Sequence, residues 1–382
     1  MNTSFINTIK ERFIAKFQSE PVLIFSPGRI NIIGEHTDYN DGFVFPAAVD
    51  KGIVGAIQKS NAQVSTAYAM DKDEVLEFSI NDLKTSASSS WQNYIIGVVA
   101  EIQKKNIELG NFNFAFGGNI PSGAGMSSSA ALENSLVFGL NEVFNLALSK
   151  QEMILISQRA EHHYVGVKCG IMDQYASMFG IKNNALLLDC RTLEAKAFEI
   201  DFKNYELLLI NTNVKHSLSD SAYNERRLVC ENAAKLMKIN ALRDASLTEL
   251  VPIKINISPD DYQKVLFVIQ ENNRVLMASK AIAAGDLSTL GKLMYASHEG
   301  LQKQYKVSCA ELDFLVSQAK LNPDILGARM MGGGFGGCTI NLIAISATEA
   351  FKSKIIQAYK NKFHTDCSIY SVQLSNGTHV IN

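Results

Sequence analysis

Apolar and polar residues alternate along the chain with two different periods, which together predict a mixture of helices and strands. Apolar residues spaced three or four positions apart are typical of amphipathic helices, and short runs of β-branched and aromatic residues are typical of strands. The helical spacing covers residues 5–17, 91–104, a segment from 130 onward, 153–166, 260–284, 287–303, 310–321 and 349–363. The strand-like runs cover residues 22–25, several stretches within 43–80, and 112–116, 185–188, 205–210, 339–345 and 368–373.

Turn and cap residues set some of the expected boundaries. Ser149 and Glu152 form a capping box at the start of one helix, and Ser258 with Pro259 is typical of a helix N-terminus. A polar loop is expected at residues 85–90, TSASSS, between the last early strand and the next helix.

Length and composition limit the possible classes of protein. A chain of 382 residues is long for one average domain, so two domains are the natural expectation. A hydrophobic content of 47% with 19% charged residues indicates a compact, soluble protein with a large core. The formal net charge of −2 argues against general binding to nucleic acid or to a membrane surface, because no basic excess exists to neutralise phosphates.

The N-terminus and the cysteines favour a cytoplasmic location. Residues 1–20 carry several charges and lack the apolar core of a signal peptide, and no apolar run is long enough to cross a bilayer. The six cysteines are far apart and form no zinc-binding spacing with the histidines, so we expect reduced thiols. No feature reports on oligomeric state, and a monomer is the default expectation.

The stretch Gly118 to Leu132, GNIPSGAGMSSSAAL, has the composition of a phosphate-binding loop. Glycines allow backbone N–H groups to approach a ligand closely, and a helix that begins just after them offers unpaired donors. An ordinary turn that caps a helix is the alternative. No Gly-Lys-Ser/Thr follows, so the stretch is not a Walker A loop. The residues expected to bind a nucleotide are Gly123, Ala124, Gly125, Met126, Ser127, Ser128 and Ser129.

The segment from Ser26 to Pro46, SPGRINIIGEHTDYNDGFVFP, crowds charged side chains among turn-forming residues. An arginine, a histidine and two carboxylates suit a polar small molecule, because charged groups form stronger hydrogen bonds than neutral ones. A solvated charged turn is the alternative.

Asp173 and Glu161 are candidates for the chemistry of the site. Asp173 lies in the apolar segment CGIMDQYASMFG, where a lone carboxylate is costly unless it is paired, so it is a candidate base with Arg29 as its partner. Glu161 is near the end of a helix and is of the type that binds Mg²⁺ beside phosphates, with a solvated helix face as the alternative. The adjacent His162 and His163 point in different directions on a helix, and we interpret them as structural.

Together these segments resemble the GHMP kinases, and the 26–46 segment resembles the galactokinase signature nearly letter for letter. The resemblance implies that Arg29 lies beside the reacting hydroxyl and that Asp173 faces the anomeric hydroxyl. It implies Ser129 and Glu161 as magnesium ligands. It also implies that galactose is held by Glu35, His36, Thr37, Asp38 and, from the phrase SAYNERR, Tyr223. The following pair, Arg226 and Arg227, has two interpretations: cations beside the phosphates, or a solvated helix face, which is the more common case. We do not assign the pair to the site.

A glycine-rich segment near the C-terminus resembles the third motif of the same kinases. Gly332, Gly334 and Gly337 spell GxGxxG, but a strand-like run follows them instead of a helix, so a Rossmann interpretation is weak. Met331 occupies a position where many relatives have threonine, which leaves a side-chain hydroxyl contact there in doubt.

The resemblance implies an α+β, two-domain GHMP kinase fold with the active site between the domains. The N-terminal domain, residues 1–200, is expected to be S5-like with a left-handed β-α-β element, and the C-terminal domain, residues 201–382, to be ferredoxin-like. The implied reaction transfers the γ-phosphoryl group of MgATP to the C1 hydroxyl of α-D-galactose, giving galactose 1-phosphate and ADP. Two alternatives stay open: a kinase for N-acetylgalactosamine or another sugar, and a non-catalytic sugar sensor on the same fold.

Overall fold

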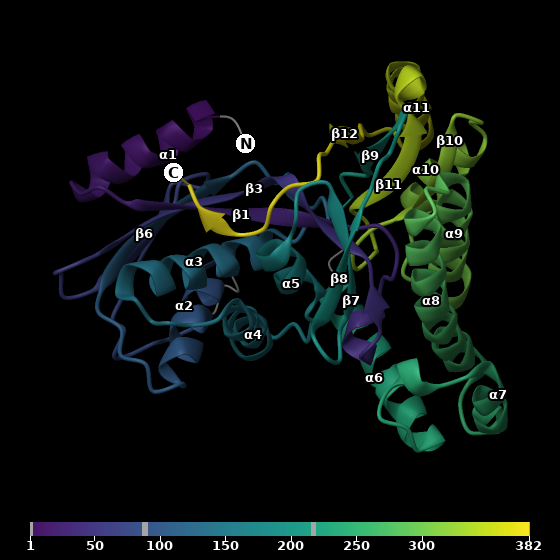
Figure 1. The fold of residues 1–382 in the computed structure, drawn as a ribbon, viewed down its shortest axis with the longest axis horizontal. Helices are drawn as coiled ribbons and strands as arrows, with labels where there is room; N and C mark the ends of the chain where they lie inside the picture. The colour runs from purple at the N-terminus through teal and green to yellow at the C-terminus, as the bar shows by residue number, and fades with distance from the viewer. Residues whose placement is uncertain (1–2, 86–90, 215–218, 382) are drawn as a thin grey trace.

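Five strands of the first half of the chain and one strand from its end form a six-stranded sheet with helices on both faces (Figure 1). The structure, a computed structural model, describes residues 3–85, 91–214 and 219–381, without the side chains of residues 219–223. The strand order is β13-β1-β3-β6-β4-β5, and every pair is antiparallel except β4 and β6. The strands are β1 (Val22–Asn31), β3 (Pro46–Lys59), β4 (Ser65–Ala69), β5 (Glu74–Phe78), β6 (Phe112–Gly118) and β13 (His379–Val380).

Side chains that alternate along these strands build two separate apolar layers. Ile53 and Ile57 of β3 face a core that is closed by four helices, whereas Val54 and Ala56 face the single helix α1 (Thr3–Phe17). The four helices are α2 (Trp91–Gln103), α3 (Ser128–Phe144), α4 (Lys150–Ala160) and α5 (Met172–Phe179). A small sheet of β2 (Phe43–Val44), β7 (Asn184–Asp189) and β8 (Glu194–Glu199) lies beside them.

The second half contains a four-stranded antiparallel sheet of order β10-β11-β9-β12. Its strands are β9 (Tyr205–Asn211), β10 (Ile325–Met330), β11 (Cys338–Ala344) and β12 (Ser368–Ser371). If β9 to β12 are numbered 1 to 4 in chain order, the order in the sheet is 4-1-3-2 when read from β12. The helices α10 (Ala310–Lys320) and α11 (Thr348–Phe363) pack on one face of this sheet. The predicted ferredoxin-like arrangement is therefore confirmed. The remaining helices are α6 (Ser219–Met237), α7 (Leu247–Leu250), α8 (Pro259–Ala283) and α9 (Leu287–Gly300).

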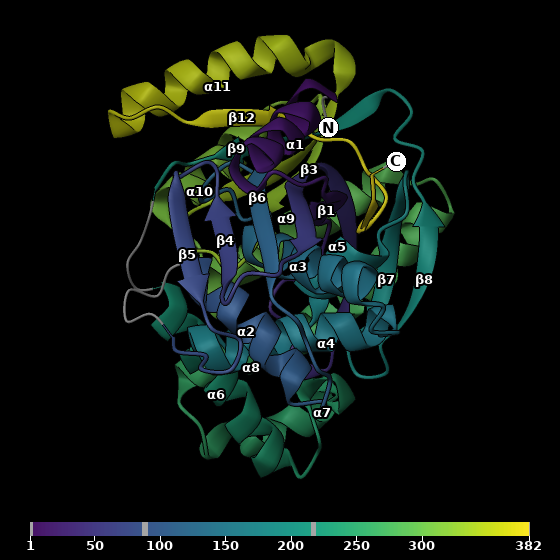
Figure 2. The ribbon, with the colours of Figure 1, turned by 90° about the vertical axis from the view of Figure 1, so that its left-hand side faces the viewer.

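A shared apolar core joins the two halves. Ile30 and Phe45 from the first half lie in the same cluster as Val275 of α8 and Ile340 of β11. The end of the chain also returns to the first sheet, where β13 pairs with β1. In Figure 2 the strands of the first half lie in front of the green helices of the second half. Loops from both halves consequently meet at this junction.

One expected strand proved longer than its sequence pattern indicated. The strand expected at 22–25 continues to Asn31 and pairs with β3 along its length, with a register shift between Pro27 and Arg29. Proline and glycine suggested a turn, but a bulge accommodates a residue that cannot donate a ladder hydrogen bond. This extension places Arg29 on a strand, in a rigid setting.

The expected helix caps are present in the structure, and the C-terminal glycine segment joins two strands. The capping box of Ser149 and Glu152 is present, and Ser258 accepts a hydrogen bond from the Asp261 N–H at 3.0 Å. The glycine segment 331–337 joins antiparallel β10 to β11, which excludes a Rossmann loop. Of the polar loop expected at 85–90, residues 86–90 are outside the described residues. No helix of the described ranges is both long and apolar enough to span a bilayer.

Candidate active site

Seven of the predicted site residues line one cavity of about 140 Å³ between the two halves, although they are spread from residue 29 to residue 173. Its lining consists of Arg29, Glu35, His36, Asp38, Ser129, Glu161, Val167, Cys169, Met172, Asp173, Gly332 and Gly333. A larger cavity, about 500 Å³, lies between α9 and α10 and contains none of the predicted residues. We place the site at the smaller cavity because titratable groups converge there.

Asp173 is held by two donors at the start of α5. The Arg29 Nε–H donates to Asp173 Oδ1 at 2.8 Å, and the Ser127 hydroxyl donates to Oδ2 at 2.5 Å. Burial alone would lower the pKa of Arg29, but the charges of Asp173 and Glu35 raise it overall. The guanidinium therefore stays charged and gives the carboxylate of Asp173 a cationic partner.

The glycine–serine loop has the backbone of an anion cradle. Gly123 and Gly125 have φ values of 69° and 66°, a region in which a side chain is unfavourable. The loop ends at Ser127, and α3 begins at Ser128, so the first N–H groups of a 17-residue helix face the loop. Gly123 also borders a third cavity, of about 130 Å³.

The loop residues differ in where their side chains lie. Ala124 and Met126 are buried in the shared core and contribute only their backbones to the loop. The Gly125 carbonyl accepts a hydrogen bond from Arg29 Nη1, and the Met126 carbonyl accepts one from the Arg29 N–H at 3.2 Å. Ser128 is exposed at the helix start. The phosphate loop is thereby attached to the strand that carries Arg29.

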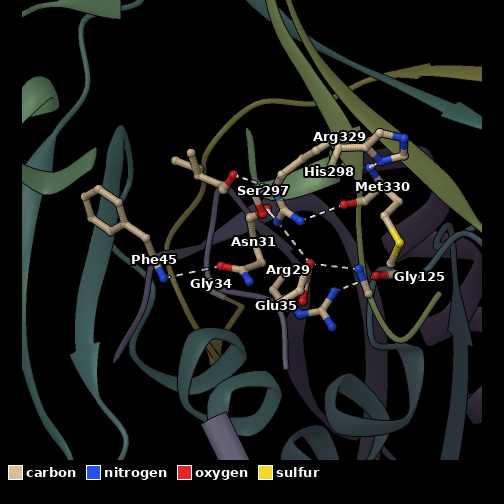
Figure 3. A network of polar contacts seen from close by, with 12 residues as sticks. Arg29, Asn31, Gly34, Glu35, Phe45, Gly125, Ser297, His298, Arg329 and Met330 are labelled. Carbon is tan, nitrogen blue, oxygen red and sulfur yellow. Dashed lines mark hydrogen bonds and ion pairs between the residues drawn. The ribbon is translucent and has the colours of Figure 1, made fainter. Parts of the chain in front are cut away.

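In the segment 34–42, Glu35 and Thr37 have different surroundings. Glu35 Oε1 accepts hydrogen bonds from Arg329 Nη2 at 3.0 Å and from the Gly332 N–H at 2.8 Å, while its side chain lines the cavity (Figure 3). The Thr37 hydroxyl lies within hydrogen-bond distance of the carbonyls of Gly34 (2.8 Å) and Phe43 (2.7 Å). Thr37 is not among the lining residues, and its hydroxyl maintains the shape of the loop.

His36 and Asp38 reach the same cavity with unusual ionisation. Burial lowers the pKa of His36 to about 3, so the imidazole is neutral, and its Nδ1 is 2.9 Å from the Tyr39 hydroxyl. Burial also raises the pKa of Asp38 to about 7, and the charge of Asp173 acts in the same direction. The Asp38 side chain keeps partial contact with solvent. The cavity thus combines a neutral imidazole with carboxyl groups, a set able to donate to and accept from sugar hydroxyls.

Residues of α8 hold the same segment from the second half of the chain. The Gly34 N–H donates to Glu271 Oε1 at 3.0 Å, and the Phe43 N–H donates to Asn272 Oδ1 at 2.8 Å. Glu271 is completely buried. Sequence reasoning missed both residues, because a carboxylate and an amide on a helix usually indicate a solvated face.

Glu161 has the surroundings of a cation ligand. Burial, together with the charge of Asp173, raises the pKa of Glu161 to about 7. A hydrogen bond from Ser129 partly offsets the increase by lowering the pKa. Among the described residues, no lysine, arginine or histidine forms an ion pair with Glu161. A buried carboxylate without a cationic partner is costly, and a divalent cation on Ser129 and Glu161 would offset that cost. The residues present therefore fit Mg²⁺.

A second buried acid, Glu133, was missed by the sequence analysis. It lies one turn after Ser129 on α3 and is completely buried. Burial, together with the charge of Glu161, raises the pKa of Glu133 well above its ordinary range. Its position four residues after Ser129 was the only available signal, since i and i+4 share a helix face.

Tyr223, the arginine pair, Met331 and the histidine pair are the remaining residues that the sequence singled out. The side chain of Tyr223 is outside the described residues. The solvated face expected for the arginine pair is wrong for Arg226, which is buried and donates to the Tyr305 carbonyl at 2.9 Å. Met331 is buried in the shared core and does not line the cavity. His162 and His163 have separate partners, as expected for structural residues: the Cys169 carbonyl and the Glu101 carboxylate.

Comparisons with known proteins agree on one family. The galactokinase galactose-binding signature matches residues 11–59, the GHMP kinase N-terminal domain residues 93–181 and the C-terminal domain residues 278–364. The chain is 40% identical to a galactokinase of Clostridium acetobutylicum, with 99% of both chains covered. It is 39% identical to one of Thermotoga petrophila, covering 93% of this chain and 99% of the relative.

Solved structures give the same result. The galactokinase of Lactococcus lactis complexed with galactose is 34% identical and superposes with a TM-score of 0.95, covering 99% of this chain and 100% of that one. The mevalonate kinase of Methanococcus jannaschii, at 18% identity, shares the fold with a TM-score of 0.68, covering 94% of this chain and 100% of that one.

Proposed function

Because the chain belongs to the galactokinases of the GHMP kinase family, we propose that it catalyses a phosphoryl transfer in this cavity. The γ-phosphoryl group of ATP passes to the C1 hydroxyl of α-D-galactose. The observation that supports this most is the position of Asp173. Its carboxylate is held by Arg29 and Ser127 at the point where the predicted sugar loop and phosphate loop meet. The products are galactose 1-phosphate and ADP.

In this proposal Asp173 is the general base. As the C1 oxygen forms its bond to the γ-phosphorus, the proton of the C1 hydroxyl passes to the Asp173 carboxylate, and the bond to ADP breaks. Arg29 is the counter-ion of Asp173, with its Nε 2.8 Å from Asp173 Oδ1. The same guanidinium offsets negative charge on the transferred group.

The nucleotide and its cation are assigned to the loop at the start of α3. The backbone N–H groups of residues 123–129 cradle the phosphates, and Ser129 with Glu161 holds Mg²⁺. When bound, Mg²⁺ supplies charge neutralisation to the phosphate oxygens. The buried Glu161, which has no cationic partner among the described residues, supports this assignment.

The sugar is assigned to the opposite side of the cavity. Glu35, His36 and Asp38 contact its hydroxyls, Thr37 shapes the loop, and Tyr223 of α6 adds a further contact. We also propose that the two domains divide near residue 201, and that the protein acts as a monomer in the cytoplasm.

A coupled assay of ADP release with galactose and MgATP tests the proposal. We expect turnover with galactose, less with glucose or N-acetylgalactosamine, and almost none in Asp173→Asn. Asp324→Asn, at an exposed position, is the matched control and should retain full activity. Absence of turnover with galactose would reject the function, and galactose binding without turnover would favour a sensor.

A further inference from the structure

Arg329 of β10 is completely buried, and its guanidinium contacts four acceptors from two segments (Figure 3). Nε donates to the Ile32 carbonyl at 2.8 Å, and Nη1 donates to the Met330 carbonyl at 2.6 Å. Nη2 donates to the Asn31 carbonyl and to Glu35 Oε1. Burying a charge is costly unless it is paired and hydrogen-bonded. These contacts offset the cost of burying the Arg329 charge.

The carboxylate of Glu35 is the counter-ion of Arg329, at 3.0 Å, and both side chains are nearly inaccessible to solvent. The two hydrogen bonds that Glu35 receives from described residues both end on Oε1, from Arg329 and from the Gly332 N–H. Glu35 also lines the cavity. Its Oε2 is consequently the oxygen available to a ligand hydroxyl.

The same contacts connect the sugar loop to the phosphate loop. Gly332, which donates to Glu35, follows Met331, whose carbonyl would lie 3.2 Å from a Cβ added to Gly125. On the other side of the phosphate loop, Arg29 donates to the Gly125 carbonyl. The glycine segment after β10 is therefore packed between the carboxylate of Glu35 and the phosphate loop.

We propose that Arg329 is a positioning residue of the sugar site, which orients Glu35 toward the sugar and joins the sugar loop to the glycine segment 331–337. The proposal rests on the proposed function, because it assigns Glu35 to the sugar. Arginine is required because its planar fork of five donors reaches acceptors in several directions, whereas lysine offers one nitrogen with three donors.

The test is Arg329→Lys, which keeps the charge and removes the fork. We expect the KM and the directly measured Kd for galactose to rise about tenfold or more, because this is the effect of losing one hydrogen bond to a charged group. The KM for ATP should rise much less. Asn341→Ala is the matched control: Asn341 is buried on the adjacent strand β11, donates to the Leu208 carbonyl at 3.0 Å, and is absent from the cavity lining.

A purely structural role would lower the Tm and the amount of active protein in both variants, and would leave the galactose Kd of the folded fraction unchanged. Arg329→Lys with a wild-type galactose Kd would overturn the proposal. Wild-type protein that neither binds nor phosphorylates galactose would overturn the proposed function and this inference together, whereas an active wild type beside an unaffected Arg329→Lys would overturn this inference alone.

A second comparison covers the case in which Arg329→Lys does not fold. The double variant Arg329→Gln with Glu35→Gln removes both charges of this ion pair, so neither charge is left buried without the other. If Arg329 acts through Glu35, the double variant and Glu35→Gln alone should have the same galactose Kd within about twofold. If the galactose Kd of the double variant is instead several-fold higher than that of Glu35→Gln alone, the two residues act independently and the proposal is contradicted.

Discussion

Replacing Asp38 by asparagine should stabilise the ligand-free protein at neutral pH while weakening its binding of galactose. Burial raises the pKa of Asp38 from its ordinary 3.8 to about 7, with the charge of Asp173 acting in the same direction. A carboxyl group with a raised pKa binds its proton more tightly in the folded state than in the unfolded state. Its ionisation therefore opposes folding.

The sign and the size follow from this shift. Between pH 4 and 7 the folded protein holds more protons at Asp38 than the unfolded chain, so the free energy of unfolding falls as the pH rises. About three pKa units correspond to ~4 kcal/mol. Because Asp38 keeps partial contact with solvent, which screens the charge, we expect about half of that, ~2 kcal/mol. For a chain of 382 residues this is a Tm difference of about 2–3 °C.

Thermal unfolding at pH 4, 5, 6, 7 and 8 without ligands measures this effect. The Tm of Asp38→Asn minus that of the wild type should be near zero at pH 4, increase to pH 7 and stay constant above it. Asp324→Asn, an exposed aspartate, should show no such trend. A difference that does not change with pH would refute the electrostatic reasoning, and an unchanged galactose KM would remove Asp38 from the sugar site.

The other predictions concern the phosphate side of the cavity. Asp173→Asn should lower kcat by about 10²–10⁴-fold with little change in galactose affinity; an almost unaffected kcat in the ADP-release assay would reject the base assignment. Gly125→Ala should raise the KM for ATP, because the residue has a φ of +66° and its Cβ would lie 3.2 Å from the Met331 carbonyl. Gly166→Ala, with a φ of +90° and open space around it, should affect only the Tm, and equal KM values for ATP in the two variants would contradict this. Glu161→Gln should raise the Mg²⁺ concentration for half-maximal activity about tenfold or more, and an unchanged Mg²⁺ titration would exclude Glu161 as a ligand.

Local features of the fold could be predicted from the sequence because their causes are local. The helix that starts after Ser149 depends on a hydrogen bond between residues three positions apart, and such a signal survives in any context. The positive φ values of Gly123 and Gly125 likewise follow from residues that tolerate them. The predicted site residues belonged to short motifs, and seven of them line one cavity in the structure.

Tertiary contacts overrode the local signal at other positions. Pro27 and Gly28 are turn-forming residues, yet they lie in the strand β1, which pairs with β3. Arg226 read as part of a solvated face, yet it is buried against backbone carbonyls of residues 305 and 306. In each case the deciding hydrogen-bond partners lie far away along the chain.

The ion pair of Glu35 and Arg329 separates what the sequence determined from what the tertiary structure decided. The sequence by itself determined which side chains are candidates to contact a sugar and a phosphate, since the motifs that contain Glu35 and Ser129 resemble those of the GHMP kinases. Only the tertiary structure decided how Glu35 is oriented, because its partner Arg329 lies 294 residues away. Whether a buried charge is tolerated depends on which segments exclude water around it and which donors they bring, and neither is encoded in the neighbouring residues.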